Sequence, residues 1–212
     1  MTGEGIVHVI DDDEGVRGAL GSLLRSAGFD VMLHATTEEF RTADVPDSAS
    51  CLILDIRLKD ENGLDFQDWL AAQERQIPVI LITGHGDIPM TVRGMKAGAT
   101  DFLPKPFSDE QMLGAVGSAI DKSRTQRAAA AGNADLVRCF HRLTPREAEV
   151  MGLVVTGLMN KQVAARLDLS EITVKIHRGN VMRKMEAQSL ADLVRMAELL
   201  GIRDEKIHRF NI

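Results

Sequence analysis

Short apolar runs alternate with amphipathic stretches along the first half of the chain. The runs are rich in β-branched residues and predict strands over residues 6–10, 30–34, 51–55, 78–83 and 100–104. They are apolar at nearly every position, which is typical of strands that are covered on both faces of a parallel sheet. Because such strands alternate here with helical stretches, the pattern predicts an α/β domain of five βα units.

Helices are expected between these strands, where apolar residues recur three and four positions apart. One helix carries Val16 to Ala27, and another surrounds Phe66. Pro89 suits the first turn of a third helix, and Ser108 suits the N-cap of the helix that follows the last strand. These helices would supply the layers that cover the sheet.

From residue 143 onward the pattern is purely helical. The segment LTPRE begins it with a capping box and a proline at the first helical position. We expect that Gly157 ends the first helix and that Asn160 and Ser170 cap the next two. The last predicted helix has apolar residues on one side: Leu190, Leu193, Val194 and Ala197.

The two patterns predict two domains of unequal size. Residues 1–122 form the α/β domain, residues 123–141 a largely helical linker, and residues 142–212 a smaller all-α domain. Charge divides in a similar way: residues 1–122 carry 10 Lys and Arg against 21 Asp and Glu, and residues 123–212 carry 15 against 10. Net charges of −11 and +5 indicate one part that holds cations and one that meets an anionic polymer.

Other sequence features narrow the class of protein. No window approaches eighteen uninterrupted apolar residues, so no membrane span is expected. The N-terminal residues MTGEG lack the basic and apolar segments of a secretory signal. Cys51 and Cys139 lie in different predicted parts without the spacing of metal ligands. A cytoplasmic protein without disulfides or a zinc site is therefore expected.

Side chains suited to Mg²⁺ and a phosphoryl group follow the ends of the predicted strands. Asp11 and Asp12 follow the first strand, Asp55 ends the third, Thr83 ends the fourth, and Lys105 follows the fifth. The carboxyl ends of parallel strands meet at one sheet edge, so these side chains should converge. Crowded carboxylates predict a divalent cation, and Mg²⁺ prefers oxygen ligands. Asp55 is the best candidate nucleophile toward a phosphoryl donor, with Thr83 and Lys105 beside the transferred group.

The segments VIDDDE, CLILD, LITGHGD and DFLPKPF, in this order, resemble the receiver domain of bacterial two-component response regulators. The resemblance covers about residues 4–122 and implies a flavodoxin-like (βα)5 fold. It also implies that a sensor histidine kinase transfers a phosphoryl group to Asp55, and that the chain is no enzyme beyond this transfer and slow autodephosphorylation.

The same resemblance assigns roles to further residues. Asp11, Asp12, Asp55 and the backbone carbonyl of Arg57 would hold Mg²⁺. The Lys105–Pro106 peptide would be cis. Thr83 and Phe102 would form the two-state element that phosphorylation biases.

This chain departs from the receiver pattern at one position and adds two notable residues. Lys59 stands where family members often have proline, four residues after the phospho-acceptor. Asp13 is a third consecutive acid and is expected to be solvated, and His85 is expected to face the kinase or the switch.

The second half contains two predicted helices that are joined by a short turn and carry basic residues. The second helix bears Lys175, His177, Arg178, Arg183 and Lys184, which suits a helix-turn-helix that binds phosphates. The segments LTPREAEV, GLMNKQVAARL and SEITVKIHR resemble the LuxR-type helix-turn-helix over residues 141–200. With the receiver, the whole chain resembles a NarL/FixJ-type response regulator of the FixJ-like branch.

This resemblance implies a phosphorylation-activated transcription factor that binds double-stranded DNA as a homodimer, with RNA polymerase as a further partner. Lys175 and Ile176 would approach bases, and Gly179 falls at a position where some relatives make a base contact. Side chains that position the DNA backbone would be Lys161, Thr173 and Arg178, and those of the dimerisation helix would be Leu190, Leu193 and Val194.

Two alternative functions remain open at this point. Phosphatases of the haloacid dehalogenase kind also use Asp, Thr, Lys and Mg²⁺, but they need a second carboxylate two residues after the nucleophile. Arg57 occupies that position and cannot be deprotonated, which disfavours turnover. The other alternative is an interaction adaptor whose helical half binds protein.

Overall fold

The computed structural model describes residues 5–44, 47–59, 61–73, 77–84 and 88–202. The chain divides into two compact units, residues 1–128 and 129–212, and each is described by itself. The boundary lies inside the linker that the sequence predicts over residues 123–141. No helix within the described ranges is long and apolar enough to cross a membrane.

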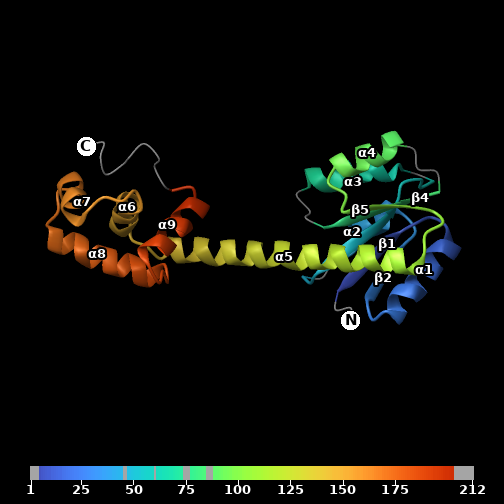
Figure 1. Ribbon diagram of the computed structural model, residues 1–212, viewed down its shortest axis with the longest axis horizontal. Helices are drawn as coiled ribbons and strands as arrows, with labels where there is room; N and C mark the ends of the chain where they lie inside the picture. The colour runs from blue at the N-terminus through green and yellow to red at the C-terminus, as the bar shows by residue number, and fades with distance from the viewer. Residues whose placement is uncertain (1–4, 45–46, 60, 74–76, 85–87, 203–212) are drawn as a thin grey trace. The chain divides into compact units, whose positions relative to one another are not determined.

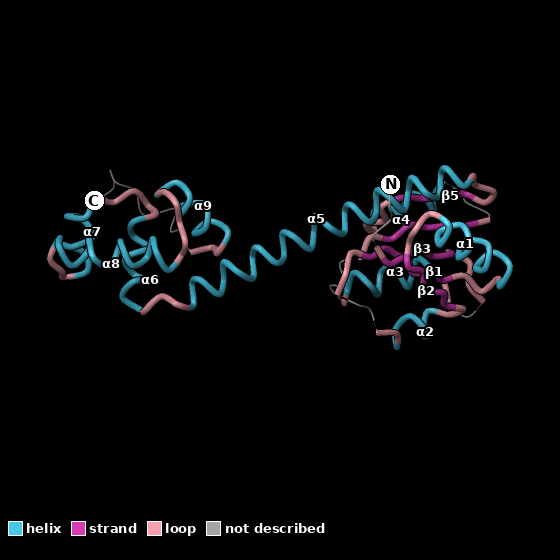
Figure 2. The backbone as a smooth tube through the Cα atoms, turned by 90° about the horizontal axis from the view of Figure 1, so that it is seen from below, coloured by secondary structure: helices cyan, strands magenta, loops and turns pink. Residues whose placement is uncertain are grey.

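The first unit is built on a parallel five-stranded sheet (Figures 1 and 2). Its strands are β1 (Ile6–Ile10), β2 (Asp30–His34), β3 (Ser50–Asp55), β4 (Val79–Thr83) and β5 (Asp101–Pro104). They follow the order β2-β1-β3-β4-β5, which is the flavodoxin-like order. The five predicted strands are confirmed within one residue at each end. The helices of this unit are α1 (Glu14–Ser26), α2 (Thr37–Thr42), α3 (Gly63–Ala72), α4 (Ile88–Lys96) and the first part of α5 (Asp109–His141).

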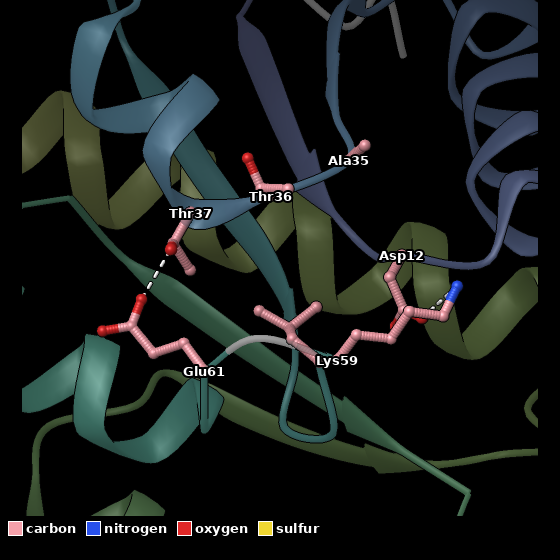
Figure 3. Close-up of a pocket in the computed structure, with 7 residues that line it drawn as sticks. Asp12, Ala35, Thr36, Thr37, Lys59 and Glu61 are labelled. Atoms are coloured by element: carbon pink, nitrogen blue, oxygen red, sulfur yellow. Dashed lines mark hydrogen bonds and ion pairs between the residues drawn. The ribbon is translucent and has the colours of Figure 1, made fainter.

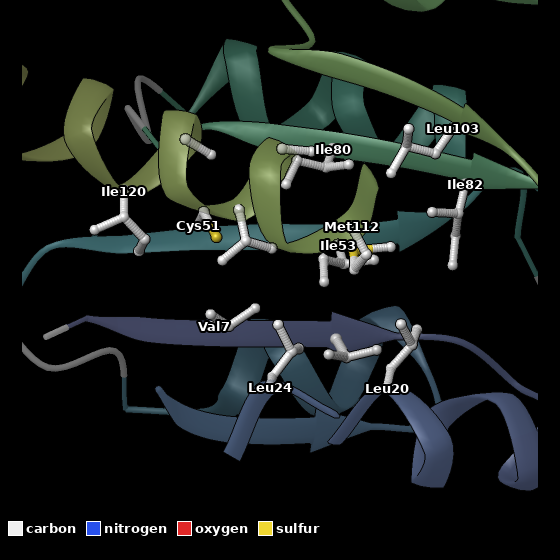
Figure 4. Close-up of a cluster of buried hydrophobic side chains, with 14 residues drawn as sticks. Val7, Leu20, Leu24, Cys51, Ile53, Ile80, Ile82, Leu103, Met112 and Ile120 are labelled. Atoms are coloured by element: carbon white, nitrogen blue, oxygen red, sulfur yellow. The ribbon is translucent and has the colours of Figure 1, made fainter. Parts of the chain in front are cut away.

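Helices cover both faces of the sheet because its strands are apolar on both sides. Figure 4 shows one face, where Leu20 and Leu24 of α1 and Met112 of α5 pack against Val7 and Cys51 of the sheet. The Cys51 thiol is fully buried, and burial raises its pKa to about 12. On the other face, Phe40 of α2 and side chains of α3 pack against β1 and β3, and Trp69 stacks on Phe66 of the same helix.

The short helix α2 was not predicted from the sequence. Thr36 caps it by accepting a hydrogen bond from the Glu39 backbone N–H, and the Thr37 hydroxyl donates to Glu61 at 2.5 Å (Figure 3). Arg41 also contacts Glu61, at 2.9 Å, so one glutamate ties the start and the end of this helix to the loop after β3. Six residues are too few for a clear helical periodicity, which explains why the sequence pattern missed α2.

The second unit is helical. Its helices are α6 (Pro145–Val154), α7 (Asn160–Leu167), α8 (Glu171–Lys184) and α9 (Leu190–Leu199). The predicted capping box of α6 and the Ser170 cap of α8 are both confirmed. The Asn160 prediction is wrong: Met159 is the N-cap of α7, and its backbone N–H donates to the Gln162 side chain. Gly157 has φ +88 and lies just after α6, as expected of a residue that follows a helix end.

Helix α5 runs without a break from Asp109 to His141. Its first part buries Met112, Val116 and Ile120 in the core of the first unit, and Leu136 belongs to the core of the second. Residues 123–141, predicted as a largely helical linker, are therefore the C-terminal part of this helix.

Candidate functional site

Two acids and one lysine meet at the carboxyl edge of the sheet. Asp11 follows β1, Asp55 is the last residue of β3, and Lys105 follows β5. The Lys105 Nζ atom donates to Asp55 Oδ2 at 2.7 Å and to Asp11 Oδ2 at 2.8 Å. A single ammonium group thus bridges two carboxylates that come from strands 44 positions apart in the chain. The Lys105–Pro106 peptide bond before the last helix of this unit is cis, as the resemblance implied.

The second oxygen of each carboxylate accepts a backbone N–H from its own loop. Asp11 Oδ1 accepts from the Asp13 N–H at 2.9 Å, and Asp55 Oδ1 accepts from the Arg57 N–H at 3.0 Å. Each aspartate is therefore held at both oxygens, one by its loop and one by Lys105. This fixes the direction in which the two carboxylates point.

Burial and the shared ammonium act in opposite directions on the pKa of Asp11. Asp11 is fully buried, and burial raises the pKa of its carboxyl although the bond with Lys105 opposes the shift. Burial lowers the pKa of Lys105, but its hydrogen bonds to Asp11 and Asp55 outweigh burial, and the net pKa is raised. The lysine therefore stays charged and compensates for the crowded carboxylates.

Asp12 and Lys59 line a pocket of about 180 Å³ beside this cluster (Figure 3). The Lys59 Nζ atom lies 3.2 Å from Asp12 Oδ2, and the Lys59 side chain is largely exposed. The sequence marked Lys59 only as an unusual replacement for proline and did not identify its partner. Asp13, expected to be merely solvated, is exposed but also caps α1 by accepting from the Val16 N–H at 3.0 Å.

The two residues expected to act as a switch occupy different environments. Thr83 is fully buried at the end of β4, and its backbone carbonyl accepts from the Lys105 N–H at 2.7 Å. Phe102 on β5 is partly buried and packs against the apolar cluster under α3. Backbone pairing therefore links Thr83 directly to the loop that carries Lys105. His85 lies outside the described residues.

The oxygen donors at this edge fit Mg²⁺ in their chemistry. Asp11, Asp12 and Asp55 supply hard carboxylate oxygens at one edge, the donor type that Mg²⁺ selects. Within the described ranges, no three His, Cys, Asp or Glu side chains are gathered as a finished metal site, and lysines pair with Asp11 and Asp12. The buried Asp11 carboxylate, whose pKa is raised by burial, is a group that a divalent cation would stabilise.

Helices α7 and α8 form a helix-turn-helix around the turn at residues 168–170, where Asp168 has a left-handed φ of 52. On α8, the side chains of Lys175 and Ile176 are exposed. Arg178 donates to Asn160 of α7 at 3.2 Å, which links the two helices. Lys161 at the start of α7 is exposed, and the Thr173 hydroxyl lies 2.8 Å from that of Ser170.

Two residues with predicted surface roles pack inside the second unit. Lys184 donates to the buried Glu147 carboxylate of α6 at 2.6 Å. Its ammonium therefore stabilises the fold and does not belong to the cations on the outer side of α8. Leu193 of α9 is fully buried in the helical core. Leu190 is 38% exposed and Val194 is partly buried.

Comparison with known proteins covers both units. Residues 7–117 match the response regulator receiver domain family, and residues 141–197 match the luxR family of bacterial regulatory proteins. Nodulation protein W of Bradyrhizobium diazoefficiens is 55% identical over 197 residues, which cover 93% of this chain and 87% of that protein. Transcriptional regulatory protein FixJ of the same organism is 39% identical over 202 residues, which cover 95% of this chain and 98% of that protein.

A solved structure shares the arrangement of elements. The structure of response regulator StyR matches with a TM-score of 0.82 at 44% identity, over 92% of this chain and 99% of that one. Both domain families occur here in one chain, and the relatives match over nearly its whole length. These findings do not favour the phosphatase or the adaptor alternative. The chain belongs to the NarL/FixJ-type transcriptional response regulators, with a receiver domain followed by a LuxR-type DNA-binding domain.

Proposed function

We propose that Asp55 is the phospho-acceptor of this regulator and that a sensor histidine kinase is the donor. A carboxylate oxygen of Asp55 would attack the phosphorus of a phosphohistidine, forming a P–O bond while the P–N bond breaks and the imidazole nitrogen takes up a proton. The observation that carries this proposal is the Lys105 ammonium, which lies 2.7 Å from Asp55 Oδ2. An ammonium in this position can bind the oxygens of the transferred group and stabilise the charge that develops on them.

The residues that would hold Mg²⁺ are Asp11, Asp12, Asp55 and the backbone carbonyl of Arg57. When bound, the cation would neutralise charge on the phosphoryl oxygens. Lys59 would release Asp12, from which it now lies 3.2 Å away, and the largely exposed lysine can do so at little cost. The Arg57 side chain is exposed and offers no general acid, so the phosphoryl group would be retained rather than turned over.

Thr83 and Phe102 would convert phosphorylation into a conformational change. Thr83 is fully buried, so we propose that its hydroxyl reaches the phosphoryl group only after a local rearrangement. Since its carbonyl is bonded to the Lys105 backbone, such a rearrangement would be transmitted to β5 and to Phe102.

The output would be a homodimer on double-stranded DNA in the cytoplasm, with RNA polymerase as a further partner. Leu190 and Val194 on α9 would contribute to the dimer, whereas Leu193, which is fully buried, would support them from the core. Lys175 and Ile176 would meet bases. The DNA backbone would be positioned by Lys161, Thr173 and Arg178, the last of which is already oriented by Asn160.

Solution mass and duplex binding test these proposals together. The full chain would be measured with and without beryllium fluoride and Mg²⁺, beside Asp55→Asn and the control Asp30→Asn, an exposed acid at the start of β2. We expect wild type and Asp30→Asn to dimerise and to bind duplex DNA more tightly with the phosphoryl mimic, and Asp55→Asn not to respond. A full response of Asp55→Asn would exclude Asp55 as the acceptor.

A further inference from the structure

The outward side of α8 is apolar from Ile172 to Gly179, the part of the helix that precedes Arg183. Ile172 is 74% exposed and Ile176 is 59% exposed, and Gly179 is exposed as well. At about 100° per residue these three positions lie within about 60° of one another around the helix axis. They form a continuous stripe along α8, which we call the apolar stripe.

The apolar stripe lies opposite the buried side of its own helix. Val174 and Val181 are fully or almost fully buried in the core of the helical unit. Helical geometry places them about 180° from the centre of the stripe. Figure 1 shows α6 and α7 on one side of α8. The exposure of Ile172 and Ile176 shows that the described part of this unit does not cover the stripe.

Cations border the stripe. Lys175 lies beside the stripe, about 40° from Gly179 around the helix axis, and Arg183 continues its line toward the C-terminal end of α8; both are exposed. Gly179 is not required by packing, because a Cβ atom at this position would meet nothing within 4 Å. Gly179 has no side chain, so the α8 backbone is open to close approach at this position of the stripe.

This arrangement matches the chemistry of the DNA major groove. The groove is bordered by phosphates on both sides, and at A·T pairs its floor presents the C5-methyl group of thymine. Two isoleucines and a glycine are too small a patch for a stable protein interface, which buries about 800 Å² on each partner. Cations at the edges and apolar groups in the centre therefore favour duplex DNA as the occupant.

We propose that Ile172 and Ile176 select thymine by contact with its methyl group, and that Gly179 lets the α8 backbone approach the bases. This inference rests on the proposed DNA binding, and it further specifies which base α8 prefers. Ile172 becomes a specificity-determining residue that neither the sequence motifs nor the comparisons assign.

Removal of single methyl groups from DNA tests the proposal. Duplexes would first be selected from a random pool with the full chain in the presence of beryllium fluoride and Mg²⁺. Thymines in the selected site would then be replaced by deoxyuridine, which lacks only the C5-methyl group. We expect wild-type affinity to fall about fourfold for each contacted methyl that is removed. Ile172→Ala and Ile176→Ala should each lose this preference at one position of the site.

Two further variants separate methyl contact from general affinity. Lys161→Ala should bind the thymine and uracil duplexes more weakly by the same factor. Gly179→Ala should also weaken both, although alanine favours the helix and has room in the free protein. The exposure of Ile172 and Ile176 means that their alanine variants should keep the fold, which circular dichroism would verify.

The outcomes distinguish the two levels of the proposal. If wild type binds a selected duplex but tolerates uracil at every position, thymine readout is wrong while DNA binding stands. If no duplex is selected or bound even at low salt, the proposed DNA binding fails first, and thymine readout fails with it.

Discussion

The imidazole of His8 on β1 stacks on that of His34 at the end of β2, with ring centroids 5.4 Å apart. Their Nδ1 and Nε2 atoms are separated by 3.2 Å, a hydrogen bond in which one ring must be the donor and the other the acceptor. Both rings are almost fully buried, and the edge of Phe40 packs against each. Neutral rings suit this environment, because two protonated imidazoles would have no acceptor between them.

Acid should therefore weaken the first unit through His8. Burial, followed by repulsion from His34, lowers the pKa of His8 from 6.5 to about 4. Between these values the unfolded chain binds a proton that the folded chain does not, so stability is full above pH 6.5 and declines as the pH falls toward 4. We expect the thermal midpoint of His8→Leu to depend less on pH between 7 and 5 than that of wild type. Equal pH slopes for the two proteins would contradict this account.

The ion pair between Glu147 and Lys184 should stabilise the helical unit. Hydrogen bonds from Lys184 and from the Thr144 backbone lower the pKa of Glu147 to about 2. Glu147→Gln removes the charge from a buried pair, and we expect the free energy of unfolding of this unit to fall by about 2–3 kcal/mol. Circular dichroism would follow the helical unit, while fluorescence of Trp69, the only tryptophan, would follow the receiver. A shift of the fluorescence transition alone would disprove the assignment.

Lys105→Ala should expose the repulsion between the two acids that it bridges. Without the ammonium, the charges of Asp11 and Asp55 repel each other. We expect the free energy of unfolding of the receiver, measured by urea titration at pH 7.5, to fall by about 1–3 kcal/mol. The loss should be smaller at pH 5, because burial already raises the pKa of Asp11 and a proton can then take the place of the ammonium. A loss that grows toward acid pH would argue against this electrostatic role.

Gly63 allows α3 to begin directly against the backbone of Asp55. A Cβ atom at Gly63 would lie 2.3 Å from the Asp55 carbonyl oxygen, which is backbone and cannot turn away. Gly63→Ala is expected to cost about 1–3 kcal/mol of receiver stability. Gly18→Ala on α1 is the matched control, because its Cβ atom would meet nothing within 4 Å, and it should gain about 0.5–1 kcal/mol. Urea titration with Trp69 fluorescence would compare them, and similar effects of both substitutions would refute the close-approach argument.

Local sequence patterns predicted most of the receiver fold. Strands such as β3 are apolar at nearly every position and end at a carboxylate, so both their extent and the position of Asp55 could be inferred. The convergence of Asp11, Asp55 and Lys105 followed from the rule that parallel strands end at one edge. The meeting of these two acids and the lysine at that edge could therefore be predicted from the sequence.

Pairings between distant side chains could not be inferred in this way. In the sequence, Lys184 contributes to the basic pattern of α8 as much as Lys175 does. Only the packing of α6 against α8 shows that Lys184 forms an ion pair with Glu147. Lys59 pairs with Asp12 across two loops, which no local pattern encodes. The N-cap of α7 was misplaced by one residue because the Gln162 side chain caps the backbone of Met159 and Asn160 is free to bind Arg178.

The contrast between the two cysteines makes the chain suitable for labelling without mutagenesis. Cys51 is buried in the sheet, and burial raises the pKa of its thiol to about 12, whereas Cys139, near the end of α5, is only partly buried. A maleimide dye should therefore attach to Cys139 alone in the folded protein, and mass spectrometry of the digested protein would locate it. Energy transfer from Trp69 to that dye would then report, in solution, how the separation of the two units responds to a phosphoryl mimic.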